Sequence, residues 1–267
     1  MTPLRLIAVA SLTLSACAPD NDRDREDRPD PTDFLLLTVS GHCFLGCSDF
    51  NEEYLVEQGT AQELADALPD ADGDVLVGGF IDSYWSWVDG DDNPLAYGFV
   101  DLVYVLEMLT DEWPEETSND TAIVLACHSH GCVWLHTALL LVPDLRVAAL
   151  VDIDAESYEW EFEWSGEIEA DGQDCDWDIS NAADAWDIPR QSDYQAVEDV
   201  VADGVDLNLE IASDDGTWLQ DGESNHRLDG SEDRIRFFQS SLNHEDSDAP
   251  DADGLAWASE RLSNILD

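Results

Sequence analysis

The chain has 267 residues and carries Asp+Glu 62 against Lys+Arg 10, a formal net charge of −52. Such a charge repels phosphate and argues against nucleic acid as a partner, while a hydrophobic fraction of 44% with ten tryptophans argues against a disordered acidic protein. A folded core under an acidic surface is therefore expected. Because the surface charges repel one another, added salt should stabilise the fold.

The first segment has the pattern of an export signal. Arg5 precedes an apolar run over residues 6–16, which is too short for a membrane-spanning helix. The run ends in "LSAC", which resembles the lipobox of bacterial lipoproteins, where the cysteine is lipidated and becomes the new N-terminus. This resemblance implies that residues 1–16 are a signal peptide and that Cys17 anchors the protein to the cell envelope, at the outer membrane or cell surface. The alternative is an ordinary secretory peptide with a chance cysteine.

The next segment, residues 17–33, predicts a tether. It is rich in proline and alternating charges and has no large apolar residue, so it cannot bury a core. The remaining residues, 34–267, are enough for one domain with one core.

From residue 34 the chain alternates short apolar runs with helix-like stretches. Nearly all-apolar strands that alternate with helices indicate a parallel sheet covered on both faces. We therefore predict an α/β fold with a mostly parallel sheet of about six to eight strands. Strands are expected at 34–40, 74–80, 121–127, 146–153, 205–212 and 234–239, and helices at 60–68, 99–109, 132–141, 192–202 and 254–266.

One stretch interrupts this alternation. "YEWEFEW", residues 158–164, places aromatic residues at every second position, which predicts an extra strand. The region 155–190 is therefore expected to be a small inserted cap. The tryptophans here and earlier could form an apolar substrate wall, fill the core, or face a membrane; they are Trp85, Trp87, Trp160 and Trp164.

The motif "CHSHGC", residues 127–132, follows a predicted buried strand and precedes a predicted buried helix. A serine in that context, with small residues two positions away on each side, is typical of a nucleophile elbow. Gly131 meets this need, and Cys127 stands where the strict motif has glycine. Here the chain resembles the α/β-hydrolase family, and within it bacterial lipases with the elbow GHSHGG. The resemblance implies that Ser129 is a nucleophile. The chain departs from the larger members of the family in that their early strands are missing here.

A serine nucleophile needs a base that is held by an acid. The resemblance implies the order serine, acid, histidine, and it favours His244, which follows the last predicted strand, over His226 in a polar loop and over the packed His136. Asp215, after the strand 205–212, is the first choice for the acid. The alternatives are Asp214 next to it, and Asp152 or Asp154 after the strand 146–153.

The oxyanion requires two backbone N–H donors. The resemblance implies one from His130, directly after the nucleophile, and one from His42 or Cys43 in the loop after the first strand. A disulfide from Cys43 to Cys47 would stiffen that loop, and two unpaired thiols are the alternative. Beyond Cys17 the number of cysteines is odd.

A metal site in "CHSHGC" is disfavoured, because side chains on such a turn point in different directions. Acidic stretches at 89–93 and 246–254 leave calcium open, although neither has the EF-hand spacing and solvated charge explains both. We expect no cofactor. The sequence thus predicts a lipid-anchored serine esterase or lipase that acts on an ester or lipid substrate. The alternative function is a surface lipoprotein that keeps the fold and binds without reacting.

Overall fold

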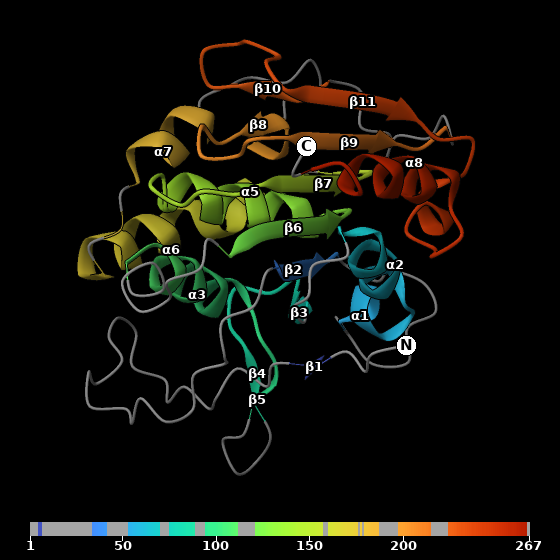
Figure 1. Cartoon of the computed structure of the whole chain (residues 1–267). Helices are drawn as coiled ribbons and strands as arrows, with labels where there is room; N and C mark the ends of the chain where they lie inside the picture. The colour runs from blue at the N-terminus through green and yellow to red at the C-terminus, as the bar shows by residue number, and fades with distance from the viewer. Residues whose placement is uncertain are drawn as a thin grey trace.

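The computed structural model describes residues 5–6, 34–41, 53–69, 75–88, 94–111, 121–156, 160–175, 177, 179–186, 197–214 and 224–265. Its centre is a seven-stranded sheet in the order β1-β3-β2-β6-β7-β9-β11, and every neighbouring pair in it is parallel. The predicted α/β fold class is confirmed (Figure 1). The strands are β1 (Arg5–Leu6), β2 (Phe34–Ser40), β3 (Val75–Ile81), β6 (Ala122–His128), β7 (Ala149–Ile153), β9 (Asn208–Ala212) and β11 (Ile235–Gln239).

Helices cover both faces of this sheet. Figure 1 shows α3, α5, α6 and α7 on one side of the molecule, and α1, α2 and α8 on the other. The helices are α1 (Tyr54–Glu57), α2 (Thr60–Ala67), α3 (Phe99–Asp111), α5 (Gly131–Leu141), α6 (Trp160–Cys175), α7 (Ser180–Trp186) and α8 (Asp253–Leu262). Among the described residues, none of the helices is long and apolar enough to cross a membrane.

The strand β2 shows why the apolar runs form a covered sheet. Its side chains alternate between two separate cores: Leu35 and Leu37 join the core under α3 and α5, and Phe34 and Leu36 join the core under α2 and α8. Because side chains of a strand alternate between faces, a run that is apolar at every position must be buried on both.

Two predicted elements are wrong. The expected strand at 158–164 is instead the start of α6, which begins at Trp160 and continues to Cys175. A period of two over seven residues competes here with glutamates that favour a helix, and the helix prevails. The region 155–190 therefore contributes the helices α6 and α7, and α7 packs against α5.

The second wrong element is the helix expected at 192–202. Its described part is a 3₁₀ turn, η2 (Val197–Asp199), followed by the short strand β8 (Val200–Val201), which pairs with β10 (His226–Arg227). The valines have apolar spacing that suits a helix, but β-branched side chains are less favourable there and fit an extended chain. One more small pair, β4 (Trp87–Val88) with β5 (Pro94–Ala96), is antiparallel.

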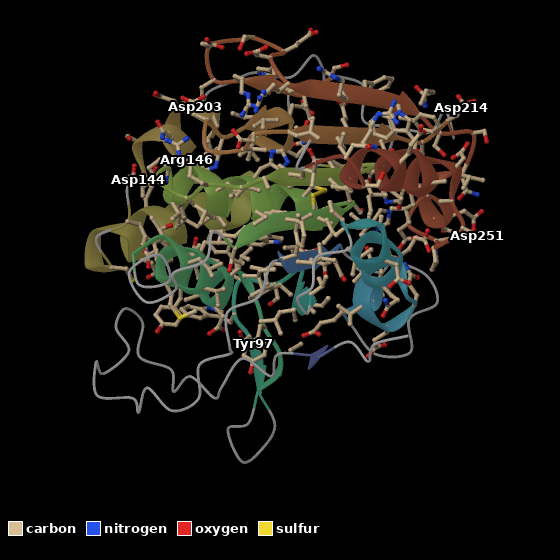
Figure 2. All side chains as sticks on the ribbon, in the orientation of Figure 1. Tyr97, Asp144, Arg146, Asp203, Asp214 and Asp251 are labelled. Carbon is tan, nitrogen blue, oxygen red and sulfur yellow. A yellow bond between two sulfur atoms is a disulfide. The ribbon has the colours of Figure 1, made fainter. Side chains whose placement is uncertain are left out.

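Acidic residues lie both at the surface and in the interior, where Asp152 and Asp154 are fully buried. The labelled aspartates Asp144, Asp203, Asp214 and Asp251 lie at the periphery in Figure 2, and all four are exposed.

Candidate active site

The strand β6 ends at His128 and the helix α5 begins at Gly131, so Ser129 lies on the turn between them. Its φ is 55°, in the left-handed region that is costly for a residue with a side chain. The strand β7 and its following residues hold this conformation: the Ser129 amide donates to the Ile153 carbonyl at 3.1 Å, and the Glu156 amide donates to the Ser129 carbonyl at 3.3 Å. The turn therefore has the backbone of a nucleophile elbow.

Two glycines let the end of β2 approach this turn. A Cβ on Gly41 would lie 2.7 Å from the Ser129 Cβ, and a Cβ on Gly131 would lie 2.5 Å from the Val39 carbonyl oxygen. Both distances are shorter than atoms tolerate. Glycine at these positions brings the chain after β2 directly against the serine.

The two cysteines of the motif form a disulfide. Cys127 and Cys132 are bonded, with their Cα atoms 4.9 Å apart, and both are fully buried. The bond joins the C-terminal end of β6 to the first turn of α5, and Ser129 lies in the loop that it closes. The pattern of cysteines in the sequence did not indicate this pairing.

The disulfide also bears on the metal interpretation. Both sulfurs lie near the Asp152 carboxylate, and the three residues are close enough to ligate a cation. Bonded cysteines offer no thiolate, however, and zinc binding to cysteine requires one. The side chains between the cysteines have partners in the protein: Ser129 contacts the His244 ring, His130 contacts Asp82, and His128 contacts both Tyr54 and His244.

Ser129 and His244 lie 115 residues apart and meet in the site. The Ser129 Oγ is 2.9 Å from the His244 Nε2. On the other side of the ring, the His244 Nδ1 is 2.5 Å from the Asp154 Oδ2. Because a carboxylate only accepts, Nδ1 carries the proton and donates it, which leaves Nε2 to accept from the serine hydroxyl. This is the order of groups that activates a serine.

The acid in this arrangement differs from the first choice made on sequence. Asp215 lies outside the described residues, and Asp214 is an exposed residue whose amide bonds to the Leu242 carbonyl at 2.9 Å. The carboxylate that contacts His244 is Asp154, the third option. It follows directly on β7, has a φ of 47°, and is fully buried. Its second oxygen, Oδ1, accepts from the Ser213 amide at 2.6 Å, so both oxygens are held.

Asp152, two residues earlier, points into the core instead. Its Oδ1 lies 3.1 Å from the His136 Nε2, and its Oδ2 accepts from the side-chain amides of Asn208 and Asn225. The other ring nitrogen of His136 lies 2.9 Å from the Val200 carbonyl. Burial alone would lower the pKa of His136, but the pairing with Asp152 raises it above the ordinary value. His136 is therefore a packed core histidine, and Asp152 is its counter-ion.

The remaining histidines have other partners. His226 belongs to β10, and its Nδ1 lies 3.5 Å from the Ser224 carbonyl. His130 is the N-cap residue of α5. Its Nδ1 lies 2.9 Å from the Asp82 Oδ1, and the Trp134 indole N–H donates to the same oxygen.

Only part of the expected oxyanion hole can be described. The first amides of a helix have no partner within the helix, so the position of His130 at the start of α5 suits a donor. A Cβ on Gly41 would lie 3.2 Å from the His130 nitrogen, so this nitrogen lies beside the chain after β2. His42 and Cys43 follow Gly41 and lie outside the described residues, as do Cys17 and Cys47.

Two site residues had no signal in the sequence. The Glu156 Oε1 is 3.6 Å from the His244 Nδ1, which adds a second carboxylate beside the imidazole. Tyr54, on the short helix α1, donates to the His128 Nδ1 at 2.5 Å. In a chain so rich in acids, a single glutamate cannot be singled out, and Tyr54 lies in no motif.

The acidic stretch at 246–254 contains carboxylates with partners in the protein. Asp248 accepts from the Gln58 side chain at 2.7 Å, and Asp253 accepts from the Ser240 and Ser241 hydroxyls at 2.5 Å and 2.8 Å. These bonds explain the two aspartates without an ion. The other candidate stretch, 89–93, lies outside the described residues.

The described part of the expected aromatic wall is Trp85. Its side chain is among the exposed large hydrophobic residues, at 43%, and its ring packs edge-on against Tyr84. The side chains of Trp87, Trp160 and Trp164 lie outside the description.

No protein-family model matches the chain, and no curated protein matches it significantly. Among solved structures, it is similar to a protein designated DphMB1, at 16% identity and a TM-score of 0.48 over 90% of this chain and 78% of that one. It is similar to an esterase domain of a Rhodothermus marinus protein, at 13% identity and a TM-score of 0.44, over 88% of this chain and 86% of that one. It is also similar to an esterase from the archaeon Pyrobaculum calidifontis, at 13% identity and a TM-score of 0.43, over 90% of this chain and 76% of that one. Likeness at this level assigns no activity, and the function has to be inferred from the site itself.

Proposed function

We propose that the protein is a serine hydrolase that cleaves carboxylic esters, as an esterase or lipase, through an acyl-enzyme on Ser129. One observation carries the proposal: the Ser129 hydroxyl lies 2.9 Å from one nitrogen of His244, while the other nitrogen lies 2.5 Å from the Asp154 carboxylate. A strained serine, an imidazole in the right tautomer and a buried acid are the groups that this chemistry needs.

Each group then has a defined role. As the Ser129 Oγ attacks the ester carbonyl carbon, its proton moves to the His244 Nε2, and the resulting imidazolium gives that proton to the departing alcohol. Asp154 holds the ring in place and stabilises its positive charge. Water then attacks the acyl-enzyme, with His244 as base, and releases the acid and the free serine.

The tetrahedral intermediate requires hydrogen-bond donors for its oxygen. We assign one donor to the His130 amide and the second to the amide of His42 or Cys43, which follow the close contact between Gly41 and Ser129. Removing one such donor typically lowers kcat on the order of 10²–10³-fold.

Labelling with a fluorophosphonate probe tests the proposal, because only an activated serine reacts with it. The parent should be labelled and should hydrolyse p-nitrophenyl esters. Ser129→Ala should lose both while keeping its melting temperature. A panel of acyl chain lengths then separates an esterase from a lipase. A folded parent that is not labelled would favour the alternative, a lipoprotein that binds through the same fold without reacting.

We further propose that Cys17 carries a lipid and tethers the enzyme to the bacterial cell envelope, after removal of residues 1–16. This removal would take the two-residue edge strand β1 (Arg5–Leu6) from the sheet and leave the other six strands. The "LSAC" ending supports this. Metabolic labelling with palmitate, followed by fractionation, tests it: the parent should be labelled and found with membranes, and Cys17→Ser should be unlabelled.

A further inference from the structure

His128, the residue directly before the nucleophile, connects three parts of the site. Its ring is buried. The Nδ1 lies 2.5 Å from the Tyr54 hydroxyl, and the Nε2 lies 3.2 Å from the His244 carbonyl oxygen. The ring also stacks on the His244 ring, with centroids 4.8 Å apart and planes 25° from parallel.

The proton positions in this chain of bonds follow from its two ends. The Gly41 amide donates to the Tyr54 oxygen at 2.8 Å, so the Tyr54 hydroxyl is left to donate to the His128 Nδ1. Since Nδ1 accepts, the proton of a neutral His128 is on Nε2, where it is donated to the His244 carbonyl. Every group in the chain is then satisfied with an uncharged His128.

The surroundings favour this uncharged form. The titratable groups that act on the His128 ring are Tyr54, which bonds its Nδ1, and Asp248, His244 and Asp154, whose charges influence its pKa. Burial, the largest influence, lowers the pKa of His128 below its ordinary value, against the opposing effect of Asp248, whose Oδ2 is 3.7 Å from the Nδ1. A neutral ring beside His244 does not repel the imidazolium that forms there during catalysis.

The His244 carbonyl oxygen, which the His128 ring bonds, has a second hydrogen-bond partner. Besides the His128 Nε2, it accepts from the Ser247 hydroxyl at 2.8 Å. His244 opens the 3₁₀ turn η3 (His244–Asp246), which is too short to fix a side chain by itself. Ser247 is the C-cap residue of this turn, so the bond from outside the turn to the His244 carbonyl is that of His128, whose ring also stacks on one face of the His244 ring.

We propose that His128, together with Tyr54, is a positioning residue that holds the His244 imidazole on Ser129 and couples it to the chain at Gly41. This rests on the proposed function. His128 does not exchange protons with the substrate. It keeps the base within hydrogen-bond distance of the nucleophile, and through Tyr54 it ties that geometry to the segment that leads into the oxyanion hole.

Two substitutions at His128 separate its bonds from its bulk. His128→Gln keeps a side-chain N–H donor for the His244 carbonyl, and His128→Phe keeps a flat ring for stacking but has no donor. Displacing a catalytic group by about 1 Å costs on the order of 10²-fold in rate. We expect kcat to fall about 10²-fold in His128→Phe and about 10-fold in His128→Gln, with KM within about 2-fold in both. His226→Gln, in the separate two-stranded sheet of β8 and β10, is the matched control.

An NMR readout makes the test independent of turnover. The His244 Nδ1 proton that is bonded to Asp154 should give a low-field resonance in the parent, in His128→Gln and in the control. It should be broadened or lost in His128→Phe. Tyr54→Phe, which removes the link to Gly41, should show the same direction of change with a smaller loss of kcat, and it carries the test if His128→Phe does not fold.

The outcomes distinguish the two proposals. A parent without ester hydrolysis or probe labelling refutes the proposed function, whereas the His128 inference is still decided by the resonance. A folded His128→Phe with the parent's kcat and an unchanged resonance refutes the positioning role. If His128 itself titrated during turnover, the kcat profile of the parent would show a second ionisation in its acid limb that is absent in His128→Gln, and that result would also refute the positioning role.

Discussion

The disulfide between Cys127 and Cys132 should stabilise the strained turn that carries Ser129, and a double-mutant cycle measures this. The bond closes a loop of six residues, from a sequence separation of 5. For a loop of this length, the loss of chain entropy in the unfolded state contributes about 2 kcal/mol. A serine in the left-handed region costs about 1–3 kcal/mol. The disulfide therefore offsets a strain of similar size at the same place.

The cycle uses Cys127→Ala, Cys132→Ala and the double variant. Each single variant loses the bond and one sulfur, and the double variant loses the bond and both sulfurs, so the coupling energy isolates the bond from packing. Cys132→Ala should be the milder single change, because the freed Cys127 thiol lies 3.2 Å from the Asp152 Oδ1 and can donate to it. That hydrogen bond partly compensates for the lost disulfide and lowers the expected coupling energy to about 1–2 kcal/mol.

Urea unfolding followed by tryptophan fluorescence, at one fixed salt concentration, gives the four free energies of unfolding. For a domain of this size, 1–2 kcal/mol corresponds to a fall of about 2–8 °C in melting temperature. A coupling energy near zero, with all four proteins folded and two-state, would show that the disulfide does not stabilise the turn and would refute this reasoning.

Three further predictions concern the acid, pH and salt. Asp154→Asn should lower kcat for ester hydrolysis on the order of 10³–10⁴-fold, because Asn no longer holds the His244 tautomer, while Asp215→Asn changes it little; the opposite ranking would restore Asp215 as the acid. Burial, with Glu57 nearby, raises the pKa of Glu53 from 4.5 to about 7. Protonated Glu53 therefore favours the folded state, and this contribution to the free energy of unfolding is fully present below pH 4.5 and is lost as the pH rises through 7. Glu53→Gln should therefore match the parent at pH 4 and, after allowing for partial exposure, be about 1–2 kcal/mol more stable at pH 8 in urea titrations; equal stability at both pH values contradicts the shift. Finally, with a net charge of −52, the melting temperature should rise from low to molar salt in a calorimetric scan, and a flat or falling curve would argue against self-repulsion.

The sequence by itself determined the parts of this protein that depend on near neighbours along the chain. Apolar runs such as 34–40 predicted strands at the observed places, because a run that is apolar at every position has to be covered on both faces. The tight turn at Ser129 could be predicted from "CHSHGC" between a strand and a helix, since such a turn needs small residues at defined offsets. The same local reading failed at 158–164 and 197–201, where short patterns matched both a strand and a helix.

Only the tertiary structure decided which distant side chains meet. His244 and Asp154 are 90 residues apart, and their contact depends on the end of β7 lying beside β6 in the sheet. With Asp+Glu 62 in the chain, nothing local distinguishes Asp154 from Asp215. The pairing of Cys127 with Cys132 likewise required the geometry of the turn, because two cysteines bond only when their Cα atoms come within the reach of a disulfide. Local residue preferences select helices, strands and turns, whereas the groups of an active site come together only through the packing of elements that are remote in sequence.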